Sequence, residues 1–279
     1  MNKDYFKLGI IGNPLSHSIS PLLQSLALKN TNLDGSYEKF EVEADKIPEL
    51  IEYFKNNNFS GFNVTIPYKI EILKYLDEIE DTSQKIGAVN TVKIQEGKLI
   101  GLNTDVYGFT YAIPKEKRNI KNAKVLGCGG AALAVIFGLK ELGCKNITIC
   151  ARNKEKALEF INNLAEKTDI NFNFEFINEI KTLEDTDILI NTTPLGTLGE
   201  NEDKMPIDEN ILKSANKNIL IYDLVYNPSM TKLLTATKEN NLSYINGLDM
   251  LILQGIKAFE IWTGKSPDFK IIKQNMIKK

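Results

Sequence analysis

Two kinds of apolar pattern alternate along the first hundred residues of the chain. Short apolar or alternating stretches at 7–12, 37–42 and 61–67 predict buried strands. Apolar positions recurring every three or four residues predict helices at 20–30 and about 45–57. Helices placed between strands predict βαβ units and a mainly parallel sheet.

The end of this first series has a different pattern. Helix-like spacing continues over 68–76, after Pro67. Two further apolar runs at 87–94 and 98–104 are separated by a turn-like "QEGK", which predicts an antiparallel hairpin at the edge of the sheet. The segment 105–121, with Gly108 and a run of charges, is interpreted as a hinge.

A second α/β series begins near residue 122. It predicts strands at 123–126, 146–152, 172–177, 187–194 and 218–225 and helices at 131–142 and 153–166. From Gly247 onward the pattern is helical and no further βαβ unit follows, so we expect this end to return and pack on the first domain.

Composition places the chain among ordinary globular proteins. Its 279 residues favour two domains. Its net charge of -2, with Lys and Arg spread along the chain, does not indicate binding to nucleic acid or to an anionic membrane. We expect no signal peptide and no membrane span. One histidine and three cysteines without a CxxC pattern make a metal site unexpected and favour a reducing cytoplasm.

A glycine turn follows the strand at 123–126. Gly127, Gly129 and Ala132 form a G-x-G-x-x-A pattern between a strand and a helix, as in turns that bind a dinucleotide pyrophosphate. The alternative is a structural strand-to-helix turn without a ligand.

The next strand ends in basic rather than acidic residues. An Asp or Glu there would bind the ribose 2′-hydroxyl of NAD, whereas Arg152, Asn153, Lys154 and Lys156 suit the 2′-phosphate of NADP. Lys154 and Lys156 also fit the solvated face of a helix. NADP is therefore favoured.

Polar residues gather where strands of the first series end, which is where ligands bind in α/β sheets. They are Asn63, Thr65, Lys69, Asn90, Asn103, Thr104 and Asp105. Lys69 and Asp105 could form a pair in which one group moves a proton and the other orients it. Taken singly, Lys69 is better interpreted as a solvated lysine and Asp105 as a helix N-cap, and the pair becomes a hypothesis only together with the dinucleotide turn.

The stretch "NPLSHSISP" at 13–21 contains three serines and the single histidine, His17. Ser20 followed by Pro21 predicts a helix start in which the serine is the cap. The alternative is recognition of a hydroxylated ligand by Ser18 and Ser20.

These motifs together resemble the shikimate dehydrogenases. "GNPLSHSISP", "GFNVTIPYK", "GAVNT", "NTD", "GCGGAA", "NTTPLG", "YDLVYNP" and "NGLDMLILQG" occur in that family's order and spacing across the whole chain. The resemblance implies an N-terminal substrate domain of mixed sheet and a C-terminal Rossmann-type NADP domain. We expect residues 1–105 with 247–279 to form the first and 106–246 the second.

The resemblance also implies a reaction and its residues. The family reduces 3-dehydroshikimate to shikimate with NADPH, in aromatic amino acid biosynthesis. Lys69 and Asp105 match the catalytic pair. The positions that match substrate-binding residues are Ser18, Ser20, Thr65, Asn90, Asp105, Tyr226 and Gln254. The positions that match cofactor-binding residues are Gly127, Cys128, Gly129, Gly130, Ala131, Arg152, Asn153, Lys156, Leu224 and Gly247.

Two features depart from the family pattern. Cys128 replaces an alanine, and "ALA" at 132–134 lacks an arginine that commonly contacts phosphate. Arg152 is retained, so NADP remains the expected cofactor. A quinate dehydrogenase that uses NAD and a non-catalytic NADP-binding protein are the alternatives. The expected partners are small molecules, without nucleic acid or membrane, for a monomer or homodimer.

Overall fold

The computed structural model describes residues 5–278. The chain divides into two compact units. The first unit runs to Gly108 and resumes at Leu251, and the second is Phe109–Met250. The helices α4 (Asp105–Ala112) and α8 (Leu248–Thr263) each cross a boundary between units.

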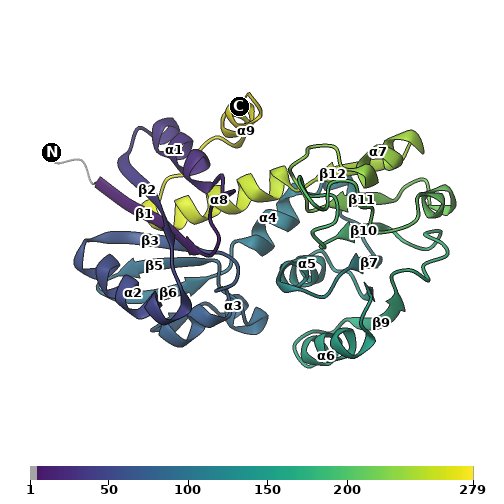
Figure 1. The fold of residues 1–279 in the computed structure, drawn as a ribbon, viewed down its shortest axis with the longest axis horizontal. Coiled ribbons are helices and arrows are strands. Elements are labelled where there is room, and N and C mark those ends of the chain that lie inside the picture. Colours follow the sequence, from purple (N-terminus) through teal and green to yellow (C-terminus); the bar gives the residue numbers. More distant parts are fainter. Residues whose placement is uncertain (1–4, 279) are drawn as a thin grey trace. The chain divides into compact units, whose positions relative to one another are not determined.

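The first unit contains a six-stranded mixed sheet in the order β2-β1-β3-β5-β6-β4 (Figure 1). Its strands are β1 (Tyr5–Gly12), β2 (Asp34–Glu41), β3 (Phe59–Val64), β4 (Glu78–Ile79), β5 (Thr91–Gln95) and β6 (Lys98–Leu102). β2, β1 and β3 are parallel, and β5 is antiparallel to both β3 and β6. The predicted parallel sheet with an antiparallel hairpin is confirmed.

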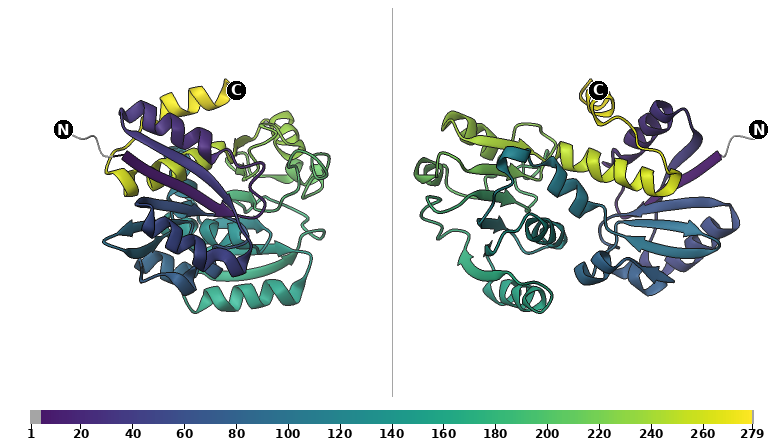
Figure 2. Two further views of the ribbon diagram at one scale, coloured as in Figure 1. Left: turned by 60° about the vertical axis from the view of Figure 1, so that its left-hand side comes forward. Right: turned by 180° about the vertical axis from the view of Figure 1, so that it is seen from behind.

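Helices cover both faces of this sheet. They are α1 (Ser20–Thr31), α2 (Ile47–Asn56), α3 (Asp81–Ile86) and α8, with short 3-10 turns at Ala44–Lys46 and Glu71–Tyr75. The unit also contains α9 (Phe269–Ile277). Phe54 of α2 packs on Phe59 and Phe62 of β3. On the other face, α1 and α8 pack against β1. Helix α9 lies beside α1, as the views in Figures 1 and 2 show.

The C-terminal helices belong to the core of the first unit. The indole Nε1 of Trp262 in α8 donates to the carbonyl oxygen of Val92 at 2.9 Å. A Cβ at Gly61 would lie 2.2 Å from that nitrogen, so only glycine lets the indole reach the sheet. The expectation that the terminal helices pack back on the first domain is confirmed.

The second unit contains a parallel six-stranded sheet in the order β12-β11-β10-β7-β8-β9. Its strands are β7 (Asn122–Leu126), β8 (Asn146–Ala151), β9 (Asn171–Phe176), β10 (Ile188–Asn191), β11 (Leu220–Asp223) and β12 (Ser243–Asn246). The order reverses at β7, because β8 and β9 lie on one side and β10 to β12 on the other. The carboxyl ends of the strands at such a reversal form the ligand crevice of doubly wound sheets.

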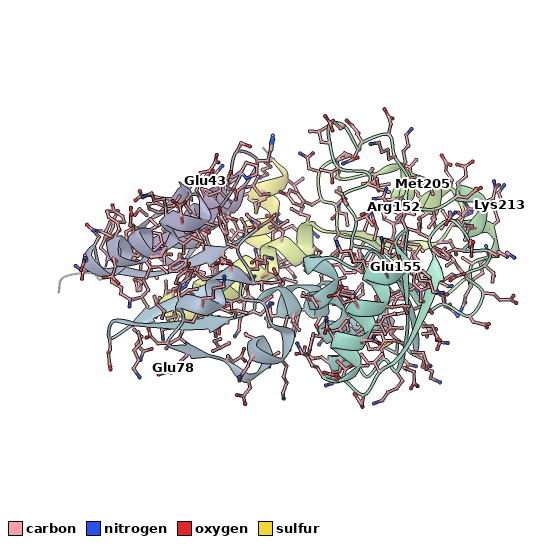
Figure 3. All side chains as sticks on the ribbon, turned by 60° about the horizontal axis from the view of Figure 1, so that its bottom comes forward. Glu43, Glu78, Arg152, Glu155, Met205 and Lys213 are labelled. Atoms are coloured by element: carbon pink, nitrogen blue, oxygen red, sulfur yellow. The ribbon has the colours of Figure 1, made fainter. Side chains whose placement is uncertain are left out.

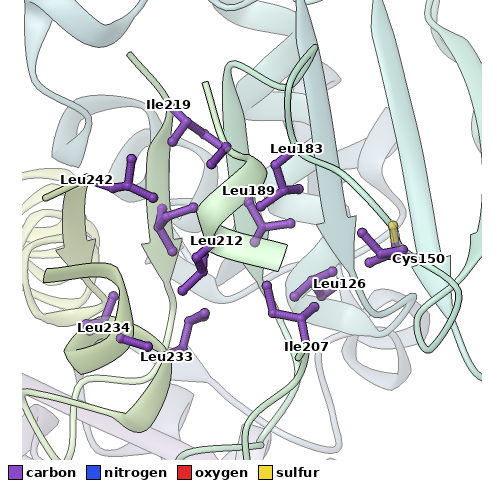
Figure 4. Packing of buried hydrophobic residues seen from close by; sticks show 14 residues of the cluster. Leu126, Cys150, Leu183, Leu189, Ile207, Leu212, Ile219, Leu233, Leu234 and Leu242 are labelled. Carbon is purple, nitrogen blue, oxygen red and sulfur yellow. The ribbon is translucent and has the colours of Figure 1, made fainter. Parts of the chain in front are cut away.

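Helices α5 (Gly130–Glu141) and α6 (Lys154–Ala165) cover one face of this sheet. The other face packs against α7 (Lys232–Glu239) and a 3-10 turn at Glu209–Ser214 (Figure 4). Another 3-10 turn lies at Lys115–Lys117. In Figure 4, Leu126 and Leu189 of the sheet face Leu212 and Leu233 of the covering layer.

The structure contradicts one of the predicted helices. Residues 68–76 do not form an α-helix, because the hydrogen bond from the Leu73 amide to the Lys69 carbonyl is not made. The Lys69 carbonyl accepts from the Val89 amide at 2.8 Å, and the Leu73 amide donates to the Ile70 carbonyl. Residues 105–112 of the expected hinge form α4, and the boundary between the two units falls after Gly108, inside this helix. Its buried positions Val106 and Phe109 have helical spacing.

Candidate active site

Lys69 and Asp105 form an ion pair in the first unit. Lys69 lies in the turn that follows β3 and Asp105 begins α4, and Lys69 Nζ lies 2.6 Å from Asp105 Oδ2. The side chains are 29% and 16% exposed, so the pair is partly shielded but reachable. Asn103, not Asp105, caps the helix, since its Oδ1 accepts from the amides of Asp105 and Val106. The alternative interpretations, Lys69 as a solvated lysine and Asp105 as the helix N-cap, are therefore wrong.

Asn90 fixes the other oxygen of the carboxylate. Its Nδ2 donates to Asp105 Oδ1 at 2.8 Å and its Oδ1 accepts from the amide of Thr104 at 2.8 Å. Asn90 is buried. Because each carboxylate oxygen of Asp105 accepts a hydrogen bond, the orientation of the carboxylate is fixed, and with it the position of the Lys69 ammonium.

Gln254 reaches the same cluster from α8. Its Oε1 lies 3.4 Å from Asn90 Nδ2 and from Thr104 Oγ1, while its Nε2 donates to the carbonyl of Leu251. Thr65 lies at the end of β3, and a Cβ at Gly12 would lie only 2.4 Å from its methyl group. The structure thus brings Lys69, Asp105, Asn90 and Gln254 into direct contact.

The serine loop, residues 13–19, is tied to the strand β2 and the residues after it. Asn13 Nδ2 donates to Glu43 Oε1 at 2.9 Å, and the Leu15 amide donates to Glu41 Oε2 at 2.7 Å. Since Leu15 is itself buried, the loop is anchored by packing as well as by charge-assisted hydrogen bonds.

Ser20 is not the cap that its sequence predicts. α1 begins at Ser20 with Ile19 as N-cap, and no side chain caps the helix. The Ser18 oxygen accepts from the Ser20 amide at 3.4 Å, and the Ser20 hydroxyl hydrogen-bonds Tyr37. The Ser20 hydroxyl therefore has no capping role, and His17 beside the two serines is exposed.

The glycine turn of the second unit fits a dinucleotide. Gly127 has a φ of +105°, and a Cβ there would lie 2.8 Å from Thr192 Oγ1, so glycine is required. A Cβ at Gly129 or Gly130 would meet nothing within 4 Å, which leaves room for a ligand. No side chain caps α5, and its first amides can donate to a phosphate.

Ala132, in contrast, is fully buried under the turn. Cys128 is partly exposed in the turn, and Ala131 is exposed at the start of α5.

Arg152 follows the next strand, β8, as an exposed side chain (Figure 3). Asn153 caps α6 by accepting from the Lys156 amide at 2.7 Å, and the side chain of Lys156 is exposed. These cations are therefore available to a ligand at the carboxyl end of β8.

Leu224 and Gly247 lie directly against each other. A Cβ at Gly247 would lie 1.9 Å from the Leu224 carbonyl oxygen, so a side chain there is excluded. Tyr226 lies two residues beyond Leu224, and burial raises the pKa of its hydroxyl, which stays protonated at neutral pH.

Two polar residues that the sequence interpretation did not single out support these sites. Asp223, buried at the end of β11, accepts from Thr231 Oγ1 at 2.7 Å and Asn191 Nδ2 at 2.9 Å. Burial raises the pKa of its carboxyl group. Tyr37 is the other, and its only sequence signal is an aromatic residue in a strand.

Other kinds of site are absent from the described part of the chain. Residues 5–278 contain no group of three or more His, Cys, Asp or Glu that could hold a metal ion. No helix within the same residues is long and apolar enough to cross a membrane.

Known proteins resemble the chain over nearly its whole length. The family model of the shikimate dehydrogenase substrate binding domain matches residues 10–92, and that of the shikimate 5′-dehydrogenase C-terminal domain matches 247–276. A shikimate dehydrogenase (NADP(+)) of Methanocaldococcus jannaschii is 42% identical over 280 residues, covering 98% of this chain and 96% of the relative.

Solved structures of shikimate dehydrogenases are also similar to this chain. A crystal structure of a shikimate dehydrogenase in complex with NADP+ has a TM-score of 0.89 and 39% identity, covering 98% of this chain and 95% of the other. A Thermus thermophilus shikimate 5-dehydrogenase in complex with NADP(H) and shikimate has a TM-score of 0.85 and 31% identity, covering 98% and 99%. The chain belongs to the shikimate dehydrogenase family.

Proposed function

We propose that this protein is an NADP-dependent shikimate dehydrogenase, which reversibly reduces 3-dehydroshikimate to shikimate in the shikimate pathway. The observation that carries the proposal is the Lys69–Asp105 pair, braced by Asn90, in a chain of this family. A protein that only bound NADP would have no use for a shielded proton-transfer pair outside its glycine turn.

NADP is the cofactor, and the residues of the second unit fit it. The backbone of Gly127–Ala131 would hold the pyrophosphate, because the space over Gly129 and Gly130 is open and α5 is uncapped. Arg152, Asn153 and Lys156 would hold the 2′-phosphate, and Leu224 with Gly247 would line the nicotinamide. When bound, NADP supplies or accepts the hydride.

Lys69 handles the proton of the reacting oxygen. In the reduction, its ammonium donates a proton to the oxygen of the former ketone, and solvent returns a proton to the amine, which is possible because the side chain is partly exposed. Asp105 holds the ammonium in position through the ion pair. Asn90 keeps the carboxylate in place, so little reorganisation is needed during the reaction.

The remaining groups bind and orient the substrate. Ser18, Ser20 and the protonated hydroxyl of Tyr226 would donate to the substrate carboxylate. Thr65, Asn90 and Asp105 would contact the ring hydroxyls. Gln254, whose Oε1 lies 3.4 Å from Asn90 Nδ2, would close over the substrate.

The test is the absorbance of reduced nicotinamide with purified protein in four pairings, shikimate or quinate with NADP or NAD. We expect rapid reduction with shikimate and NADP alone. Comparable turnover with quinate and NAD would instead make the protein a quinate dehydrogenase. Inactivity in all pairings, by folded protein that binds NADP, would contradict an enzymatic function.

We also infer that the enzyme works in a reducing cytoplasm, as a monomer or homodimer. All three cysteines are free thiols, and burial raises the pKa of Cys144 to about 11 and that of Cys150 to about 12. Neither of these two thiols is ionised or reactive near neutral pH. Light scattering on purified protein would determine the oligomeric state.

A further inference from the structure

Tyr37 of β2 has a buried hydroxyl in the first unit, away from Lys69 in sequence. The side chain is 8% exposed, and its ring lies 6.4 Å from the ring of Trp262. Its hydroxyl donates to Asn63 Oδ1 at 2.7 Å and also hydrogen-bonds the Ser20 hydroxyl. Packing against an indole needs only the ring, so the hydroxyl requires another explanation.

The amide of Asn63 determines which way these hydrogen bonds run. Its Nδ2 lies 3.1 Å from two acceptors, the carbonyl oxygen of Asn90 and Thr91 Oγ1. The Oδ1 atom therefore faces Tyr37 and needs a donor, which the single Tyr37 proton supplies. The Tyr37 oxygen is then left to accept from Ser20.

The hydrogen bonds keep the same donor-to-acceptor direction as far as the ion pair of Lys69 and Asp105. Thr91 Oγ1 donates to Asn90 Oδ1 at 3.0 Å, and Asn90 Nδ2 donates to Asp105 Oδ1 at 2.8 Å. Each of these residues is less than a tenth exposed, except Asp105, which is 16% exposed. These hydrogen bonds connect Ser20, which is partly exposed, through the buried Tyr37 and Asn63 to the carboxylate that holds Lys69. Such a network is strengthened when all its members are satisfied.

Resting on the proposed function, we propose that Tyr37 is a positioning residue, whose hydroxyl sets the place of Ser20 and the orientation of Asn63. A substrate carboxylate is a stronger acceptor than a phenol, so Ser20 gives its proton to the carboxylate from a position that Tyr37 has already set. Asn63, oriented by the same hydroxyl, holds the backbone of Asn90 in register with Asp105.

The variant Tyr37→Phe keeps the ring and removes only the hydroxyl. We expect the KM for shikimate to rise about fivefold to tenfold, from the loss of about one hydrogen bond, with the KM for NADP within about twofold. A purely structural defect would lower the amount of active enzyme and leave both KM values unchanged.

Tyr68→Phe is the matched control. Tyr68 is equally buried in the first unit, and its hydroxyl donates to the Val42 carbonyl at 2.6 Å, outside this network. We expect it to lose stability without a change in the KM for shikimate. In a Ser20→Ala background, Tyr37→Phe should raise that KM by a smaller factor than in the parent, because only the orientation of Asn63 is then lost.

A second measurement does not depend on turnover. Shikimate bound to the parent protein should raise its Tm, and the same concentration should raise the Tm of Tyr37→Phe less. The inference would be overturned if Tyr37→Phe kept the KM for shikimate and the shikimate-induced rise in Tm of the parent. It would also be overturned if Tyr68→Phe changed both quantities as much as Tyr37→Phe does. In either case an active parent would still support the proposed function. A parent inactive with shikimate would overturn the proposed function itself.

Discussion

Replacement of Lys69 by alanine tests the proposed proton transfer most directly. The Lys69 ammonium is held 2.6 Å from Asp105 Oδ2, whose second oxygen accepts from Asn90, so the proton donor has one orientation. A positioned general acid contributes about 10²- to 10⁴-fold to a rate, which corresponds to roughly 3 to 5 kcal/mol of barrier.

We therefore expect Lys69→Ala to lower kcat by about 10²- to 10⁴-fold while the KM for shikimate changes little, because the lost interaction acts mainly in the transition state. The assay is the initial rate of NADP reduction at saturating shikimate and NADP. Calorimetric titration with NADP would confirm that the variant still binds the cofactor in its second unit.

Lys74→Ala is the matched control in the same unit. Lys74 pairs with Glu71 at 2.7 Å and its side chain is 66% exposed, so its removal deletes an ion pair of similar length with no role in the site. Its kcat should equal that of the parent. If Lys69→Ala kept kcat within about tenfold of the parent, or roughly 1.4 kcal/mol of barrier, another group would have to handle the proton.

Three further variants test other parts of the sites. Arg152→Ala should raise the KM for NADP at least about tenfold and that for NAD much less, since only NADP carries the 2′-phosphate; parallel rises in both would contradict this role. Glu41→Ala removes the acceptor of the Leu15 amide and should raise the KM for shikimate about threefold to tenfold, with an unaltered value showing that the serine loop holds without it. Gly127→Ala places a Cβ 2.8 Å from Thr192 Oγ1 at a φ of +105° and should weaken NADP binding, measured by titration, and lower the Tm; full binding would refute the need for glycine.

The sequence predicted the parts of the fold that depend on local pattern. β1 from Leu8 onward and all of β10 are buried on both faces, and their apolar runs identify them without tertiary information. Residues 68–76 were misread because the Val89 amide takes the carbonyl that a helix would need, and that contact joins residues twenty positions apart. Nothing in the local spacing indicates it.

The candidate site shows the same limit at the level of side chains. Lys69 and Asp105 could be suspected because polar residues at strand ends gather at one edge of a sheet. Ser20 has the sequence of a helix cap, yet its hydroxyl bonds Tyr37 from a neighbouring strand. Tyr37 itself looks like an ordinary strand residue, since only the register of β1, β2 and β3 brings it to Asn63.

The return of the last helices to the first unit has a consequence for how the protein is made. On the ribosome, residues 109–250 emerge complete before the segment from Leu251 is synthesised, so the second unit can fold while the first still lacks α8. Until then the sheet around Gly61 lacks the Trp262 indole and the Asn90 cluster lacks Gln254. A nascent chain would thus be able to bind NADP before it could position shikimate, and a chain cut short near its end would be a cofactor-binding product without turnover.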